Sequence, residues 1–198
     1  MEKLLICGDS FSCPGTGSWS NLLGYQFNIT NLSQAGSSEY RIWKNWQQQK
    51  LSNYDIAIVC HTSSNRIYSE NNFFYNADSR HNHCDLLYLD VKSKLPLMPA
   101  QHITWFFENV FDIEHATLNH ELLINKWVNT DWPIPVLHIT FFDTNLPQVC
   151  CFFKEWQQYS GNINHLTAQG NIAVGDLILQ QINILQGAWH GRSNTRPS

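Results

Sequence analysis

One short segment, residues 55–60, constrains the fold more than any other part of the chain. Its sequence, Asp-Ile-Ala-Ile-Val-Cys, is apolar after the first position and rich in β-branched side chains. A strand that is apolar on both faces is typical of the centre of a parallel sheet, because helices cover both faces of such a sheet. The segment therefore predicts the central strand of an α/β fold.

Strand-like and helix-like segments alternate along the rest of the sequence. Short apolar or alternating segments predict further strands at 3–7, 28–33 and 135–142. Apolar residues at helical spacing predict helices at 18–27, 39–51, 84–95, 100–127 and 166–186, whereas residues 150–159 fit either type. This alternation predicts about five parallel strands with helices on both faces. We expect one domain over residues 1–198, with residues 187–198 as a tail.

Composition argues against several classes of partner. The net charge of -4 gives no general attraction to nucleic acid or to anionic lipid. No segment approaches the ~20 apolar residues of a transmembrane helix, and the first apolar run is too short for a signal peptide. We therefore expect a cytoplasmic protein without nucleic-acid or membrane partners, which acts on a small molecule or a carbohydrate. A virus particle is the alternative location.

Polar segments follow the predicted strands at the positions where parallel sheets hold their sites. In open α/β sheets, ligands bind in the crevice beyond the carboxyl ends of the strands. Residues 8–13, 61–66 and 143–147 occupy such positions.

Four short segments carry a resemblance to a known family. In chain order they are Gly8-Asp9-Ser10, Ala35-Gly36-Ser37, Ser63-Ser64-Asn65-Arg66 and Asn162-Ile163-Asn164-His165. Their order and spacing, over nearly the whole chain, resemble the four blocks of the SGNH (GDSL-like) hydrolases. The resemblance implies a flavodoxin-like three-layer sandwich and a serine ester hydrolase.

The same resemblance implies a role for each block. Ser10 would be the nucleophile and His165 its base, because a serine hydroxyl needs a base within hydrogen-bond reach. The oxyanion would be held by the backbone N–H groups of Ser10 and Gly36 and by the side-chain amide of Asn65. A simpler alternative for Gly36 is that it only lets its loop turn.

The last block departs from the family pattern. The family has an aspartate where this chain has Asn162. An aspartate orients the histidine and stabilises its cation, whereas an asparagine adds no charge. The orienting residue is therefore Asn162 or Asp143, which ends the strand at 135–142, or else Ser10 and His165 act as a dyad.

The third block also differs, and it adds candidates for substrate binding. Ser63 and Arg66 stand where the family has glycine and aspartate. Arg66 either holds a substrate or pairs with a surface carboxylate. Asp9, Arg66 and Tyr68 are the candidate substrate-binding side chains.

These residues predict an esterase with an acyl-serine intermediate that removes acetyl or another short acyl group from a glycan. The alternatives are a non-catalytic SGNH-like binding or structural module and a lipid or thioester hydrolase of the same fold. No glycine-rich phosphate loop is present, and His81, His83 and Cys84 lack a zinc-binding spacing. We expect neither a cofactor nor a metal.

Overall fold

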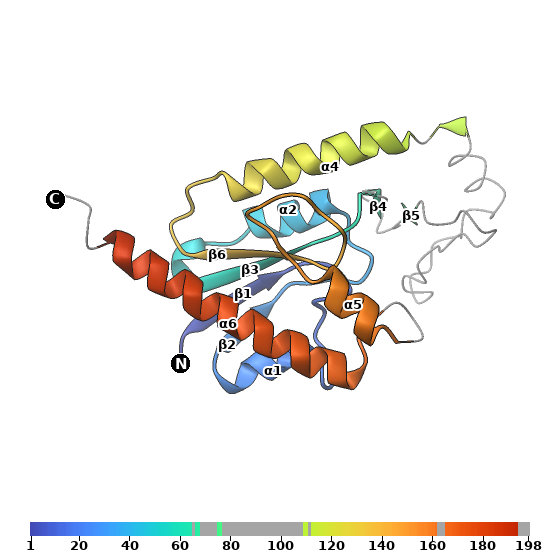
Figure 1. The fold of residues 1–198 in the computed structure, drawn as a ribbon. Helices are drawn as coiled ribbons and strands as arrows, with labels where there is room; N and C mark the ends of the chain where they lie inside the picture. Colours follow the sequence, from blue (N-terminus) through green and yellow to red (C-terminus); the bar gives the residue numbers. More distant parts are fainter. Residues whose placement is uncertain (65, 68–74, 77–108, 111, 162–164, 194–198) are drawn as a thin grey trace, which may run out of the picture.

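A five-stranded parallel sheet forms the centre of the molecule (Figure 1). The computed structural model describes residues 1–64, 66–67, 75–76, 109–110, 112–161 and 165–193. The strands, in the spatial order β2-β1-β3-β6-β7, are β1 (Lys3–Cys7), β2 (Asn28–Asn31), β3 (Ile56–His61), β6 (Val136–Thr140) and β7 (Cys150–Cys151). All neighbouring strands in this sheet are parallel, which confirms the prediction. A separate antiparallel pair joins β4 (Arg66–Ile67) to β5 (Tyr75–Asn76).

Helices cover both faces of the sheet, as predicted for a three-layer sandwich. On one face, α1 (Trp19–Leu22) and α5 (Phe153–Tyr159) pack against α6 (Ala168–Ser193). On the other face, α2 (Glu39–Gln47) packs against α4 (Ile113–Val128). Two short 3-10 helices, η1 (Leu23–Tyr25) and η2 (Leu51–Asn53), lie in the connections. No helix among the described residues combines the length and the apolarity needed to cross a membrane.

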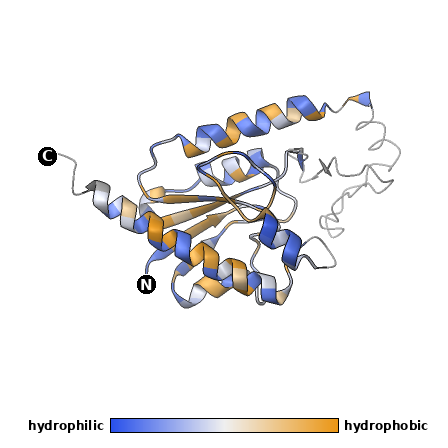
Figure 2. Cartoon of the chain, in the orientation of Figure 1, coloured by the Kyte–Doolittle hydropathy of each residue, from blue (hydrophilic) through white to orange (hydrophobic). Residues whose placement is uncertain are grey.

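Alternating side chains of the strands build two separate cores. In β1, Leu4 and Ile6 join the core under α1 and α6, whereas Leu5 and Cys7 join the core under α2 and α4. Hydrophobic residues accordingly run through the central strands and along much of α6 (Figure 2). Fully burying one such aliphatic side chain contributes ~1.5–3 kcal/mol, so both faces of the sheet hold the helices in place.

The register of the sheet places three loops at the same edge. Cys7 of β1 lies opposite Val59 of β3, and Val59 lies opposite His138 of β6. The residues that follow these strands therefore leave the sheet side by side. This edge is where sequence reasoning placed the crevice.

Several helix boundaries differ from the prediction: the helices predicted at 18–27 and 39–51 end at Leu22 and Gln47. Of the helix predicted at 100–127, residues 100–108 and 111 lie outside the described residues, and α4 begins at Ile113, where the Asp112 side chain accepts a hydrogen bond from the N–H of His115 (3.0 Å) and caps the first turn. The predicted tail, residues 187–198, is helical as far as Ser193, since its two glycines lower helix propensity by only ~1 kcal/mol each and its only proline is Pro197. Residues 150–159 contain β7 followed by α5. The helix predicted at 84–95 lies outside the described residues.

Candidate functional site

The loop after β1 carries Ser10 and turns tightly beneath it. A Cβ atom on Gly8 would lie 2.7 Å from the Cβ of Cys60 and 3.0 Å from the Cys60 carbonyl oxygen, so only glycine fits at this position. Ser12 is fully buried, and its hydroxyl donates to the Ser33 hydroxyl (2.9 Å). Ser10, between these two fixed points, is half-buried.

The carboxylate of Asp9 anchors this loop from below. It is fully buried and accepts hydrogen bonds from the N–H of Phe11 (3.0 Å) and from the hydroxyl of Thr62 (2.8 Å). The Nη1 atom of Arg66 lies 3.3 Å from the same carboxylate oxygen that Thr62 contacts. Burial raises the pKa of Asp9, although Arg66 and the two hydrogen bonds oppose this shift.

These contacts give Asp9 and Arg66, the candidate substrate-binding residues, partners within the protein. Asp9 has no exposed surface and both of its oxygens are engaged within the protein. The side chain of Arg66 is only 7% exposed and pairs with Asp9, which is a buried carboxylate and not the surface partner that the alternative assumed. The pair therefore ties the loop after β3 to the loop that carries Ser10.

The loop after β2 packs against the Ser10 loop. The N–H of Gln34 donates to the carbonyl of Gly8 (3.1 Å), next to the hydrogen bond between Ser12 and Ser33. Gly36 is buried and has a φ of 75°, a conformation that favours glycine. The predicted second block thus lies against the first block, with a turn that requires glycine.

Phe11 brings the last block to the same place. Its ring stacks on Phe141 with centroids 4.9 Å apart, and its centroid lies 5.4 Å from that of His165. The His165 side chain is exposed, and its carbonyl accepts a hydrogen bond from the N–H of Gly161 (2.6 Å). The residue that follows Ser10 is therefore in ring contact with the predicted base.

Several predicted residues are not placed by these contacts. Asn65, Tyr68 and Asn162 lie outside the described residues, as does the segment with His81 and His83. Asp143 is exposed and lines a cavity at the end of β6. Within the described part of the chain, no hydrogen bond or ion pair joins Asp143 to His165.

A buried polar network that sequence reasoning missed begins at Glu39, the first residue of α2. Glu39 is only 4% exposed. Its carboxylate accepts hydrogen bonds from Nδ1 of His61 (2.7 Å) and from the N–H of Thr62 (3.1 Å). Burial alone would raise the pKa of Glu39, but the imidazoles of His61 and His120 and these hydrogen bonds hold it below its usual value.

Two further histidines extend this network. Nε2 of His61 lies 3.0 Å from Nδ1 of His138, and the two rings are stacked. His120 donates from Nε2 to the carbonyl of Thr62 (2.7 Å), and this nitrogen is 3.7 Å from the Glu39 carboxylate. Burial lowers the pKa of His138 and of His120, so both rings are neutral at pH 7. Ionised Glu39 can only accept, so Nδ1 of His61 is the donor in their hydrogen bond.

Thr62 connects this network to the Ser10 loop. Its N–H donates to Glu39, its carbonyl accepts from His120, and its hydroxyl donates to Asp9. The network therefore links α2, α4 and the ends of β1, β3 and β6. The sequence signals for it were the histidine that ends the clearest strand and the glutamate that opens the helix after Ser37-Ser38. In the part of the chain that the structure describes, no group of three His, Cys, Asp or Glu side chains could hold a metal ion.

The comparisons with known proteins give structural likeness at low identity. No family model and no curated protein matches the sequence. An acetyl xylan esterase matches with a TM-score of 0.43 and 13% identity, over 91% of this chain and 99% of the other. A lipase/acylhydrolase from Enterococcus faecalis matches with a TM-score of 0.41 and 12% identity, over 92% and 95% of the two chains. A catalytic mutant of an acetylxylan esterase from Geobacillus stearothermophilus matches with a TM-score of 0.40 and 11% identity, over 91% and 94%. Likeness at this level assigns neither a family nor an activity to this chain.

Proposed function

We propose that this chain is a serine ester hydrolase that forms an acyl-serine intermediate and removes acetyl or another short acyl group from a glycan. The observation that carries the proposal is the convergence of three chain segments on the Ser10 loop. The 33–36 loop is hydrogen-bonded to it, the loop after β3 contacts it through Thr62, and His165 packs against Phe11. The low charge of the chain favours a neutral glycan as the substrate.

In the first half of the reaction, the Ser10 hydroxyl oxygen attacks the ester carbonyl carbon while His165 takes the hydroxyl proton. The carbonyl oxygen becomes an oxyanion. The backbone N–H groups of Ser10 and Gly36 and the Asn65 amide would hold it, each donor contributing ~3 kcal/mol. The bond to the sugar oxygen then breaks, and His165 returns its proton to that oxygen as the sugar leaves.

In the second half, water attacks the acyl group on Ser10. His165 takes a proton from this water, the bond between the acyl carbon and the serine oxygen breaks, and the proton passes to Ser10. The products are a short carboxylic acid and the free enzyme. Asn162 or Asp143 would orient His165 during both halves.

The direct test is covalent labelling with a fluorophosphonate probe. The serine oxygen should displace fluoride from the probe, so the parent protein should gain the mass of one probe less HF and should hydrolyse an acetyl ester, whereas Ser10→Ala should do neither. Ser52→Ala removes an exposed serine in η2 and is the matched control, which should behave as the parent does. Stability of Ser10→Ala should change by ~0.5 kcal/mol or less, because the change is small and lies in a loop. Equal labelling of Ser10→Ala and the parent would overturn the proposal.

A non-catalytic binding module is the second candidate. Arg66 favours it, because the third block is built around a buried arginine–aspartate pair instead of the family's pattern. For such a module, the probe would label neither the parent nor any variant, and no ester would be hydrolysed.

A further inference from the structure

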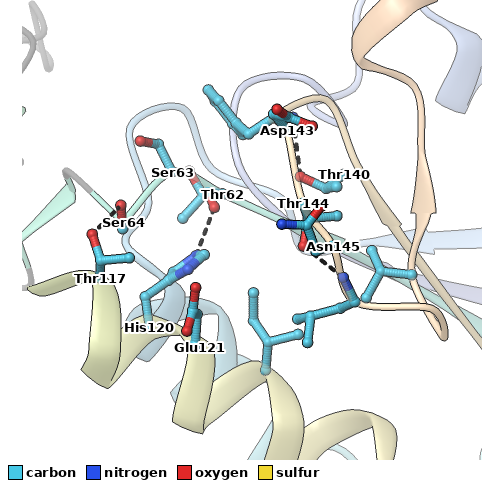
Figure 3. Close-up of a pocket in the computed structure, with 14 residues that line it drawn as sticks. Thr62, Ser63, Ser64, Thr117, His120, Glu121, Thr140, Asp143, Thr144 and Asn145 are labelled. Atoms are coloured by element: carbon cyan, nitrogen blue, oxygen red, sulfur yellow. Dashed lines mark hydrogen bonds between the residues drawn. The ribbon is translucent and has the colours of Figure 1, made fainter.

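A cavity of about 410 Å³ lies beside the Ser10 loop, at the carboxyl ends of β3 and β6 (Figure 3). Its walls come from the loop after β3, from α4 and from the loop after β6. The volume falls within the ~300–1,000 Å³ that is typical of small-molecule sites. Neither the proposed nucleophile nor the proposed base lines it, so it is separate from the reacting atoms.

The polar lining of the cavity favours a ligand without negative charge. Glu121 of α4 and Asp143 of the loop after β6 bring two carboxylates to it from different walls. Among the described residues that line it, none is a lysine or an arginine. His120 is the remaining titratable group, and burial lowers its pKa, so it is neutral at pH 7. An anion would therefore be repelled.

The rest of the lining matches the two faces of a sugar. The hydroxyls of Ser64 and Thr117 and the amide of Asn145 supply further hydrogen-bonding groups. Ile124 and Leu146 supply apolar surface. Carboxylates and amides accept hydrogen bonds from hydroxyl groups, and the C–H face of a pyranose can lie against an apolar wall.

Thr62 connects this cavity to the loop that carries Ser10. Cys7 lies opposite Val59, and Ser10 and Thr62 each follow three residues later. Thr62 lines the cavity and donates its hydroxyl hydrogen bond to Asp9, the neighbour of Ser10. This 2.8 Å hydrogen bond puts the Thr62 wall in direct contact with the loop that carries Ser10.

We propose that this cavity is a subsite for a neutral, hydroxyl-rich ligand, namely a sugar unit of the substrate, and that Glu121 and Asn145 bind its hydroxyl groups from facing walls. The proposal rests on the proposed function for the identity of the ligand as part of the substrate. Binding in the cavity, however, does not require Ser10 to react.

The test uses Ser10→Ala, which binds without turnover, and follows backbone amide NMR signals during titration with xylobiose. We expect shifts at Glu121 and Asn145. Adding Glu121→Ala or Asn145→Ala should weaken binding ~10-fold, since each removes hydrogen bonds to the ligand. The control adds Glu114→Ala, which removes an exposed glutamate from the same helix outside the cavity. This control should bind xylobiose as tightly as Ser10→Ala alone.

Charged sugars complete the test. Glucuronate should bind more weakly than xylobiose because of the two carboxylates. Glucosamine bound much more tightly than xylobiose, with loss in Glu121→Ala, would identify a cation site and overturn the proposal. Absent binding, or binding that Glu121→Ala and Asn145→Ala leave unchanged, would also overturn it. If sugar binding persists but the probe never labels Ser10, the hydrolase proposal fails while this one stands.

Discussion

At the scale of single residues, the sequence departs most from the SGNH pattern that it resembles at Asn162. Where a serine hydrolase has an aspartate before its histidine, the carboxylate selects one tautomer and stabilises the imidazolium that forms during attack. An asparagine can accept a hydrogen bond from the imidazole through its amide oxygen, but it contributes no negative charge. Because the side chain of His165 is exposed, we expect turnover to be sensitive to a change of charge at position 162.

Asn162→Asp should therefore increase turnover on a simple acetyl ester. The ceiling is ~10⁴-fold, the loss seen when a triad aspartate becomes asparagine, but we expect ~10-fold, because Asp143 or a backbone carbonyl can already orient the ring. The apparent pKa of the base should rise in the pH–rate profile, since a nearby negative charge favours protonated histidine.

Asn164→Asp is the matched control, because it adds the same charge two positions further along the sequence. If both variants accelerate the reaction equally, the effect is one of general charge and not of orientation. If Asn162→Asp is no faster than the parent, position 162 does not orient the base, and Asp143→Asn should then lower turnover.

At the scale of elements, the N-terminus of α2 connects the loops of the site. Glu39 is a positioning residue: it holds the N–H of Thr62, whose hydroxyl in turn holds Asp9 below Ser10. Glu39→Gln removes the charge that accepts from His61 while keeping the size of the side chain. We expect ~1–3 kcal/mol lower stability, because a buried charge-assisted hydrogen bond is lost.

The same variant should lower kcat about tenfold with little change in KM, because the loop that carries Ser10 would no longer be held in one geometry. Glu39→Asp, which keeps the charge, should recover part of kcat. The measurement is steady-state kinetics at a temperature where melting curves show every variant to be folded, with Glu114→Gln on α4 as a surface control. Unchanged kcat together with lower stability would limit Glu39 to a structural role.

The secondary-structure elements were predictable where a short sequence segment alone identifies the element. The strands β1, β3 and β6 were predictable because a strand buried on both faces is a continuous apolar run. The polar loops that follow these strands predicted the edge of the sheet that they share. The contact between Glu39 and His61 was not predictable, because it joins residues 22 positions apart and depends on which face each side chain takes. The pairing of Arg66 with Asp9 was not predictable for the same reason: Asp9 is distant in sequence and fully buried.

At the scale of the whole molecule, buried titratable groups make stability depend on pH. The folded pKa values of His138 and His120 are lowered, chiefly by burial, so the unfolded chain binds more protons as the pH falls below about 6.5. These two histidines therefore destabilise the fold progressively under mild acid. Glu39, whose pKa is lowered, adds to this loss below about 4.5. Asp9 has a raised pKa and acts in the opposite direction, because protonation removes the free-energy cost of burying its negative charge.

The free energy of unfolding should consequently fall between pH 7 and pH 5, in a window where the histidines titrate and Glu39 stays ionised. Urea unfolding at pH 7, 6 and 5 measures this slope. His138→Gln should be less stable than the parent at pH 7, because it disturbs the stacked pair with His61, yet its stability should decrease less between pH 7 and pH 5. His115→Gln, at an exposed histidine of α4, should keep the slope of the parent. A parent protein equally stable at pH 7 and pH 5 would mean that His138 and His120 take up their protons in the fold without cost, which is incompatible with the lowering of their pKa values by burial.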